Sequence, residues 1–364
     1  YKLVEALCEA NGQDVADLDY LLENVAIATV ADVMDLTEEN RILVKQGLEM
    51  LKRTSNLGLR ALIQCIGLEG KKIQAYHIGF ILAPCLNASG KLDTAKRALA
   101  LLRAKTEREA DMLAGDLKAL NESRRDMTDR VVDEAMAKVE QTDIREDKVL
   151  VIYLPDCHES LAGLVAGRVR ENYYRPVFVL TDSEDGVKGS GRSIESYSMY
   201  EELTGCGDLL TKFGGHPMAA GLSLDKENVE KFKRRLNDQC TLSEEELTEK
   251  VVIDMELPFA AITEHFIEEL EYMEPFGKGN TKPVFAARGV VMQHVKIIGK
   301  NKNVAKATAI DAAGNRMEAI CFHDAQEFAE RCEKNNGKMS ITFYPGINEF
   351  RGERQIQIVI THYR

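Results

Sequence analysis

The chain has 364 residues, 45% of them hydrophobic and 29% charged, as in an ordinary globular protein of about two or three domains. Its formal net charge of −12 excludes a protein that grips duplex nucleic acid with its whole surface, although a narrow basic channel stays compatible with that charge. No apolar run approaches the ~20 residues that cross a bilayer, so no membrane association is expected. Eight widely spaced cysteines without a C-x-x-C pair indicate reduced thiols in a cytoplasmic protein.

The first elements are expected to be a buried strand and an amphipathic helix. Residues 24–33, NVAIATVADV, are apolar and β-branched, and they predict a strand that ends at Asp32. Thr37 is the expected N-cap of the helix that follows. Two shorter helices are predicted near 57–66 and 73–83.

The middle of the chain predicts a long helix and then a strand–helix–strand unit. From Thr94 to about Gln141 there is no proline and one glycine, and apolar residues recur at helical spacing. If continuous, this helix would be ~70 Å long and would connect two domains. The strands KVLVIYL and PVFVL flank a helix over about 158–171 and predict a parallel pair. Small residues at i, i+4 spacing on that helix indicate close packing on the sheet.

The C-terminal part, after a polar segment at 241–250, predicts a small β barrel or sandwich. Five or six short strands separated by turn residues follow one another from about residue 283. Residues 284–310 contain no acid and five basic residues, namely Arg288, Lys296, Lys300, Lys302 and Lys306.

Two glycine-containing segments are candidates for binding an anion. In KFGGHPMAAGL, Gly214 and Gly215 precede His216, so backbone amides would be approachable, and an imidazole could donate to a phosphate or ligate a metal. In KGSGRS, Ser190 and Arg192 offer hydroxyl and guanidinium donors together. The alternative in each case is a plain turn, with glycines that need positive φ and a histidine that caps a strand.

Two further segments carry candidate site residues. Asp32, at the end of the expected strand, is a candidate Mg²⁺ or Mn²⁺ ligand, and a helix-capping role is equally open. Asp35 is the weaker candidate. In APCLNASGKL, Asn87 and Lys91 could reach a backbone phosphate, or the segment is simply the turn that ends a helix.

The order of these motifs along the chain resembles that of the RecJ exonucleases, in the DHH phosphoesterase superfamily. The motifs are VAIATVADVMDLTEENR, LAPCLNASGKLDTA, CHESLAGLVAGRV, GSGRS, FGGHPMAAG and LEYMEPFGKGNTKPVF. The resemblance covers nearly the whole chain and implies an α/β plus β fold. Its expected parts are the C-terminal part of a DHH domain (1–93), a long connector helix (94–145), a DHHA1-like substrate-binding domain (146–242) and an OB-fold-like nucleic-acid-binding barrel (243–364).

The resemblance implies a 5′→3′ exonuclease of single-stranded DNA that acts in repair and recombination and uses two divalent ions, Mn²⁺ or Mg²⁺. By motif position, Asp32 would be a metal ligand, and Asp32 and His216 would be catalytic. The expected phosphate-binding residues are Asn87, Lys91, Ser190, Arg192, Gly214 and Gly215. The expected nucleic-acid-binding residues of the barrel are Arg288, Lys296, Lys300 and Lys302. The implied partners are single-stranded DNA with a 5′-phosphate and replication or repair proteins, and a monomer is expected.

The chain departs from the family pattern in three ways. Arginine is usual where Cys85 and Lys91 stand, and glycine is usual where Ser160 stands. The Asp-rich motifs and the Asp-His-His motif have no match here. Most metal ligands would therefore lie before Tyr1, and the chain alone is expected to be inactive.

Three other functions are compatible with parts of the pattern. The first is a non-catalytic module of the same superfamily that binds single-stranded DNA or a replication partner. The second is a nanoRNase or cyclic-dinucleotide phosphodiesterase, which the C-terminal strands disfavour. The third is an alanyl-tRNA-binding domain, which the long segment around Asp32 disfavours.

Overall fold

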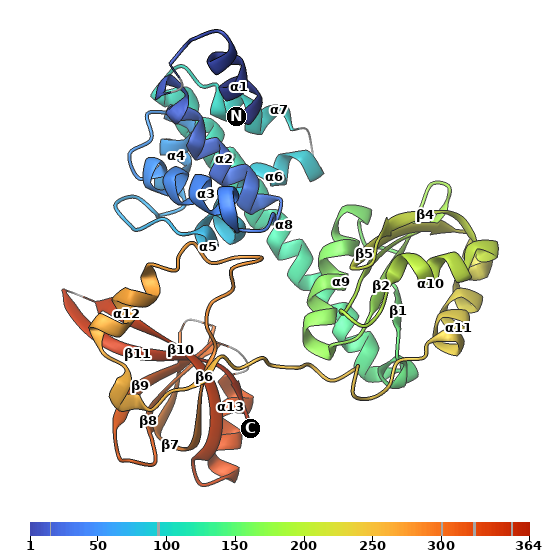
Figure 1. The fold of residues 1–364 in the computed structure, drawn as a ribbon. Helices are drawn as coiled ribbons and strands as arrows, with labels where there is room; N and C mark the ends of the chain where they lie inside the picture. Colours follow the sequence, from blue (N-terminus) through green and yellow to red (C-terminus); the bar gives the residue numbers. More distant parts are fainter. Residues whose placement is uncertain (15, 93–94, 300, 323–324, 351) are drawn as a thin grey trace. The chain divides into compact units, whose positions relative to one another are not determined.

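The structure, a computed structural model, describes residues 1–14, 16–92, 95–299, 301–322, 325–350 and 352–364 (Figure 1). These residues form two units. Unit 1 combines Tyr1–Thr54, Leu68–Ala83 and Val251–Arg364, and unit 2 combines Ser55–Gly67 and Pro84–Lys250. Within the described residues, no helix is both long and apolar enough to cross a bilayer.

The N-terminal part of unit 1 is helical. Its elements are α1 (Lys2–Ala10), η1 (Ala16–Leu21), α2 (Leu22–Ala31), α3 (Glu38–Leu51), α5 (Ala75–His77) and η2 (Ile78–Leu82). Thr37 occupies the N-cap position of α3, as expected. α3 lies directly against α2, because a Cβ added at Gly47 would overlap the carbonyl oxygen of Leu22.

The expected strand at 24–33 is wrong, because these residues belong mainly to α2. Leu22, Ala26 and Ile27 are buried, and their i, i+4 and i+5 spacing is that of one helix face. Asp32 is the C-cap of this helix and does not end a strand. A short apolar run does not by itself distinguish a buried strand from a buried helix.

The first part of unit 2 is also helical, with α4 (Leu57–Cys65), α6 (Ala83–Leu92), α7 (Lys96–Leu102), α8 (Glu107–Gln141) and η3 (Asp143–Glu146). The expected single long helix is divided into α7 and α8. The break occurs at Thr106, whose hydroxyl accepts a hydrogen bond from the amide of Glu109 at 3.2 Å. α8 has 35 residues and so a length of ~52 Å. Gly58 allows α4 to lie against the carbonyl of Leu101, which an added Cβ would overlap.

The rest of unit 2 is a five-stranded sheet of order β1-β2-β3-β5-β4. Its strands are β1 (Leu150–Tyr153), β2 (Val177–Ser183), β3 (Gly186–Arg192), β4 (Leu210–His216) and β5 (Ala219–Leu224). β1 and β2 are parallel and joined through α9 (Glu159–Tyr173), which confirms the predicted strand–helix–strand unit, and the other pairs are antiparallel.

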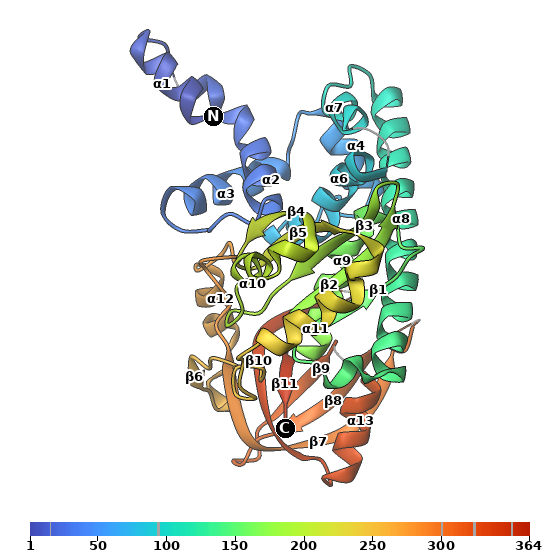
Figure 2. The same ribbon diagram turned by 90° about the vertical axis from the view of Figure 1, so that its right-hand side faces the viewer.

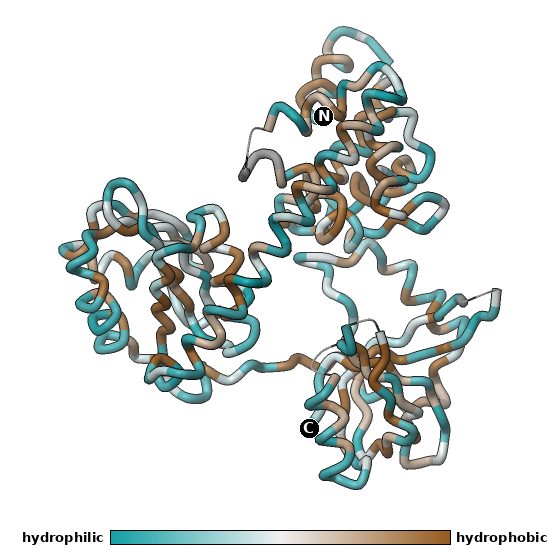
Figure 3. The backbone as a smooth tube through the Cα atoms, turned by 180° about the vertical axis from the view of Figure 1, so that it is seen from behind, coloured by the Kyte–Doolittle hydropathy of each residue, from teal (hydrophilic) through white to brown (hydrophobic). Residues whose placement is uncertain are grey.

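Helices cover both faces of this sheet. α8 and α9 cover one face at β1 and β2, while α10 (Met199–Gly205) and α11 (Val229–Gln239) cover the other (Figure 2). Figure 3 shows the hydrophobic residues concentrated in the strands between these helices. The short η4 (Gly207–Leu209) and η5 (Lys226–Asn228) complete the unit. On its own side α9 packs on β2 and β3, and β5 and β4 follow β3 in the sheet. The candidate site lies on this face.

The C-terminal part of unit 1 is a closed five-stranded barrel, as predicted. Its strands are β7 (Phe285–Ile298), β8 (Val304–Ile310), β9 (Arg316–Cys321), β10 (Lys338–Phe350) and β11 (Glu353–Tyr363). They pair in the order β10-β11-β9-β8-β7, and a β10–β7 pairing closes the barrel. α13 (Ala325–Lys334) connects β9 to β10, and β6 (Met255–Glu256) extends the edge of β7. η6 (Phe259–Ala261) and α12 (Glu264–Glu271) precede β7.

Candidate functional site

The sheet of unit 2 brings together five of the predicted site residues. Ser190 and Arg192 lie in β3, and Gly214, Gly215 and His216 lie in β4. Both segments lie in strands and not in turns, but two features of the turn alternative are present, since Gly215 has a positive φ and His216 is the last residue of β4. β5 lies between β3 and β4 and pairs with both, so non-local strand pairing overrides the low strand propensity of glycine.

Strand register arranges four of these residues in two adjacent rows, while Gly215 pairs with Ala220 between the rows. Arg192 pairs with Ala219, which pairs with His216. Two residues further along, Ser190 pairs with Gly221, which pairs with Gly214. Because paired residues and alternate residues of a strand point to the same face, both rows share one face of the sheet.

Helix α9 reaches the edge of this face through Gly163. A Cβ added at Gly163 would be 2.7 Å from Nη2 of Arg192 and 2.9 Å from Oγ of Ser190. The small residues of α9 were expected to serve packing alone. At Gly163 the helix packs directly on two candidate phosphate-binding side chains, a contact that the sequence pattern did not indicate.

The glycines that flank Ser190 serve the hydrophobic core. A Cβ at Gly189 would be 2.5 Å from Cδ2 of Leu180, and one at Gly191 would be 2.5 Å from Sδ of Met199. Both positions therefore face the α10–α11 side of the sheet. Their small size follows from core packing and does not require a bound anion.

The glycines of β4 and β5 have different roles. Gly215 has φ of +151°, and an added Cβ would overlap the carbonyl oxygen of Ala219, so only glycine fits there. A Cβ at Gly214 would meet no atom within 4 Å, and one at Gly221 would meet only the carbonyl oxygen of Gly189, at 3.9 Å. Gly214 and Gly221 thus leave the backbone beside Ser190 bare and open.

Arg192 is half-buried and has no carboxylate partner among the described residues. Its Nη1 donates to Oγ of Ser190 at 3.3 Å and to the carbonyl of Gly191 at 2.8 Å. Burial, and to a smaller extent the nearby Arg170, lower the pKa of the Arg192 guanidinium from its ordinary value. A guanidinium stays charged in proteins, so this desolvated cation would gain strongly from a bound anion.

A groove of about 630 Å³ continues from the Ser190 row along the same face. Besides Ser190 and Gly214 it is lined by Lys188, Lys212 and Ser223, which the sequence analysis did not single out. The sequence contained a pattern that could have identified the two lysines. Lys188 lies two positions before Ser190 and Lys212 two positions before Gly214, and residues two apart in a strand share a face.

The first turn of α9 forms one wall of this groove. His158 is the N-cap, and its Nδ1 accepts a hydrogen bond from the amide of Ser160 at 3.2 Å. The hydroxyl of Ser160 lies 2.8 Å from the same nitrogen. Both side chains therefore stabilise the start of the helix.

The two residues predicted in APCLNASGKL, Asn87 and Lys91, are not among the site residues that the sheet of unit 2 brings together. The segment is helix α6 and not a turn. Asn87 is exposed on it, and the side chain of Lys91 lies outside the described part of the structure. Cys85 is buried, and burial raises the pKa of its thiol to about 11, so it packs as a neutral side chain.

Asp32 lies in unit 1, whereas the residues gathered in the sheet belong to unit 2. It is exposed at the end of α2, and Val33 after it has φ of +55°, a rare conformation for a β-branched residue. Among the described residues, no three or more His, Cys, Asp or Glu side chains form a group that could hold a metal ion. Because Mg²⁺ needs about six oxygen ligands, these residues alone do not fit a divalent-ion site.

The chain just after Asp32 is fastened to the segment 271–282. The amide of Leu36 donates to the carbonyl of Lys278 at 2.7 Å, and the ammonium of Lys278 pairs with Asp35 at 2.9 Å. A Cβ at Gly277 would be 2.7 Å from Cδ1 of Leu36, so the two segments are in direct contact. Asp35 is therefore engaged in an ion pair.

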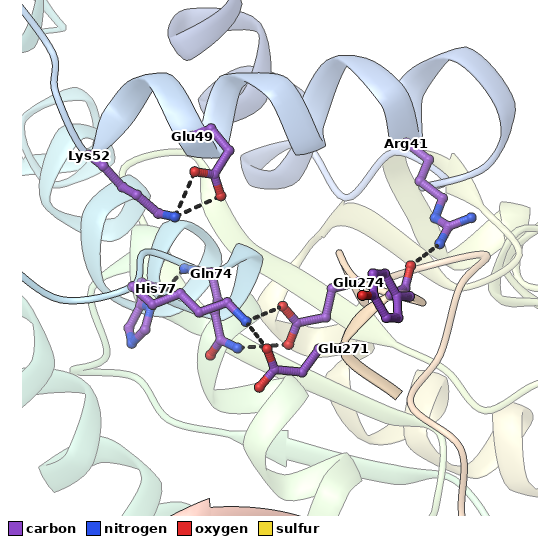
Figure 4. Close-up of polar contacts among 9 residues, drawn as sticks. Arg41, Glu49, Lys52, Gln74, His77, Glu271 and Glu274 are labelled. Carbon is purple, nitrogen blue, oxygen red and sulfur yellow. Dashed lines mark hydrogen bonds and ion pairs between the residues drawn. The ribbon is translucent and has the colours of Figure 1, made fainter. Parts of the chain in front are cut away.

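Further polar contacts hold the same segment (Figure 4). Nη2 of Arg41 donates to the carbonyl of Met273 at 2.9 Å, and Nε2 of Gln74 donates to Glu274 at 2.9 Å. Lys72 forms ion pairs with Glu271 at 2.8 Å and with Glu274 at 3.1 Å. The motif EPFGKGN thus anchors the start of α3, which follows the turn that contains Asp32.

The predicted basic residues of the barrel differ in whether they form ion pairs. Arg288 forms an ion pair with Glu256 at 2.5 Å. Within the part of the barrel that is described, Lys296 and Lys302 have no ion-pair partner. Lys296 is near the end of β7 and Lys302 is in the turn to β8, so the unpaired charges are at one end of these strands. Lys300 lies outside the described residues.

Comparison with known proteins identifies two parts of the chain, the five-stranded sheet with its helices and the barrel. Residues 146–242 match the family profile of the DHHA1 domain, and residues 253–362 match that of the RecJ OB domain. The structure aligns over 100% of its length with 54% of the crystal structure of RecJ in complex with Mg²⁺ from Thermus thermophilus, with a TM-score of 0.82 and 26% sequence identity.

Curated relatives agree with this match. The chain is 36% identical over 346 residues to the single-stranded-DNA-specific exonuclease RecJ of Bacillus subtilis, in an alignment that covers 94% of the chain and 44% of that relative. It is 32% identical to the Escherichia coli protein of the same name, over 95% of the chain and 61% of the relative. The chain thus spans about half the length of the relatives it matches. Identity at this level over almost the whole chain shows that it belongs to the RecJ family.

Proposed function

We propose that this chain is the substrate-holding part of a 5′→3′ exonuclease that degrades single-stranded DNA in repair and recombination. The observation that carries the proposal is the half-buried Arg192, which contacts Ser190 and has no carboxylate partner in the described structure. Such a cation at an open sheet face suits a terminal phosphate, because a guanidinium binds phosphate oxygens with two parallel hydrogen bonds.

In this proposal Arg192 and Ser190 hold the 5′-phosphate, and His216, in the same row as Arg192, donates to a phosphate oxygen. The bare backbone at Gly214 and Gly221 admits the strand. The barrel, with Lys296 and Lys302, binds the backbone further along.

We further propose that hydrolysis in this family depends on Mn²⁺ or Mg²⁺, since crystal structures of RecJ from Thermus thermophilus contain each ion. Asp32 would be one ligand. Because the described residues gather no complete ligand set, we assign no hydrolytic step to this chain alone. The eight cysteines are reduced thiols, which suits a cytoplasmic location. Replication or repair proteins remain proposed partners, and we propose a monomer.

The phosphate role is tested by binding of 5′-phosphorylated and 5′-hydroxyl oligonucleotides. Arg192→Ala should weaken binding of the phosphorylated strand by about 10- to 100-fold, since a hydrogen bond to a charged group contributes about 1.5–3 kcal/mol. Binding of the 5′-hydroxyl strand should change little. Arg234→Ala, which removes an exposed arginine of α11, is the matched control and should change neither affinity. Equal losses for both oligonucleotides would remove the end-recognition role.

A non-catalytic binding module is the second candidate, because the described residues include no metal-binding group. Release of nucleotides from 5′-phosphorylated single-stranded DNA in Mn²⁺, compared between the chain and Asp32→Ala, separates the alternatives. Activity that Asp32→Ala abolishes would mean that this chain is a nuclease by itself. Binding without activity in either protein would agree with a substrate-holding role.

A further inference from the structure

We propose that Lys188 and Lys212 form a second phosphate-binding position, which holds an internal phosphodiester of the strand whose 5′ end lies at Arg192. The proposal rests on the proposed function, because it extends the same binding face away from the end site. It is carried by strand register, by the groove and by the distribution of charge.

The position lies in a third row of the sheet. Lys188 pairs with Ser223, which pairs with Lys212, so the two lysines flank a hydroxyl on the face that carries Arg192. Successive rows are two residues apart, which is ~6.8 Å at ~3.4 Å per residue. This separation is of the order of one nucleotide step in an extended single strand. The lysine row is two rows from Arg192, or ~14 Å.

The path from the Ser190 row, next to Arg192, to the lysine row is open. The groove of about 630 Å³ includes both the Ser190 row and the lysine row. Its floor has no side chain at Gly214 and Gly221, so a sugar–phosphate backbone can approach the sheet closely. The hydroxyls of Ser190 and Ser223 provide donors along this floor, one in each row.

The charges along the groove favour an anion. Lys212 is exposed and has no ion-pair partner in the part of unit 2 that is described. Lys188 pairs with Glu159 at 2.6 Å, and Glu159 is the one acid among the groove residues. A phosphate above Ser223 would lie between the two ammonium groups, and the exposed Lys188–Glu159 pair is weak enough to rearrange.

A nucleobase is a poorer occupant of this groove. Base binding by single-strand-binding proteins relies on stacking against exposed aromatic faces. Phe213 is the one aromatic ring among the groove residues besides the imidazole of His158. Phe213 alternates with Lys212 and Gly214 and points to the opposite face, where its ring lies 6.2 Å from that of Tyr200. The groove surface is therefore polar and suits the backbone.

The test measures affinity of the whole chain for 5′-phosphorylated oligothymidylates of one to five nucleotides. For the unmodified chain, affinity should rise once the strand is long enough to reach the lysine row. Lys212→Gln should reduce the affinity for the longer strands by about tenfold, and it should leave the affinity for the mononucleotide unchanged. It should also lower the salt dependence by about 0.7 in the log–log slope, the value for one phosphate contact on a single strand. Lys231→Gln, on the exposed face of α11, is the control and should behave as the unmodified chain does.

The outcomes separate this inference from the proposed function. If Lys212→Gln weakens every length equally, or none, the second position does not exist. If Arg192→Ala leaves binding of the mononucleotide unchanged, the end site at Arg192 is wrong, whatever Lys212 does. If Lys212→Gln and Lys231→Gln reduce the rise of affinity with strand length equally, the rise reflects general charge attraction, and the proposal is overturned.

Discussion

Substituting Gly163 with alanine tests the contact between α9 and the candidate phosphate site. The added methyl carbon would lie 2.7 Å from Nη2 of Arg192 and 2.9 Å from Oγ of Ser190. Both atoms are at the ends of side chains, and the guanidinium is the more flexible. We therefore expect Gly163→Ala to displace the guanidinium and to leave the backbone of α9 in place.

The expected changes in stability and in affinity differ. Alanine in place of glycine within a helix gains about 0.8–1 kcal/mol, and loss of the hydrogen bond between Arg192 and Ser190 costs about 0.5–1.5 kcal/mol. The free energy of unfolding should therefore stay within about 1 kcal/mol of its original value. A displaced guanidinium would lose charged hydrogen bonds to phosphate, so affinity for a 5′-phosphorylated strand should fall by about tenfold or more.

Gly167→Ala is the matched control, one helical turn further along α9. A Cβ there would meet nothing within 4 Å. The free energy of unfolding of this variant should therefore rise by about 0.8–1 kcal/mol, and its affinity for the phosphorylated strand should not change. Urea denaturation and fluorescence anisotropy with a phosphorylated oligonucleotide measure the two quantities. Unchanged affinity in Gly163→Ala would refute the reasoning about Arg192. A loss of more than about 2 kcal/mol would mean that the helix itself had moved.

Three further predictions concern stability. Gly215→Ala should destabilise the fold by about 2 kcal/mol or more, because Gly215 has a positive φ and an added Cβ would overlap the backbone of Ala219. Gly214→Ala should change the free energy of unfolding by less than about 0.5 kcal/mol, and thermal denaturation of the two variants measures the difference. Asn56→Ala should cost about 1 kcal/mol in chemical denaturation, since Oδ1 of Asn56 caps α4 by accepting from the amide of Leu59 at 3.0 Å; an unchanged midpoint would contradict the cap. The raised pKa of Cys85, to about 11, means that the folded state holds this proton more tightly than the unfolded state. Its contribution to stability should be complete below about pH 8.5 and be lost as the pH rises toward 11. Cys85→Ala should make the loss of stability over that pH range smaller without removing it, because burial also raises the pKa of the Cys206 and Cys332 thiols to about 11.

Some errors of the sequence analysis had a readable signal. The break between α7 and α8 falls at TERE, a Ser/Thr-x-x-Glu pattern typical of a helix start, and the hydroxyl of Thr106 does cap α8. Helical spacing on both sides of the break obscured it. For residues 24–33 no such signal exists, because an apolar β-branched run suits a buried strand and a buried helix equally. Only the packing of α2 against α3 decided between the two.

The sequence by itself determined the family, the parallel strand–helix–strand unit and the C-terminal barrel. Motif order is carried by the chain directly, and alternating or continuous apolar runs are local patterns with a direct structural meaning. The sequence also identified Ser190, Arg192 and His216 as residues whose side chains could bind a phosphate. It did not place them in paired strands, because glycine-rich segments have a low local strand propensity.

Only the tertiary structure decided how these residues meet. The pairing of β5 with both β3 and β4 aligns Arg192 with His216 and Lys188 with Lys212. That register depends on hydrogen bonds between strands distant in sequence, which no local pattern encodes. The same holds for Gly163, whose contact with Arg192 arises where α9 packs across the sheet. Local chemistry thus identified the candidate phosphate-binding side chains, and long-range strand pairing determined which of them lie side by side.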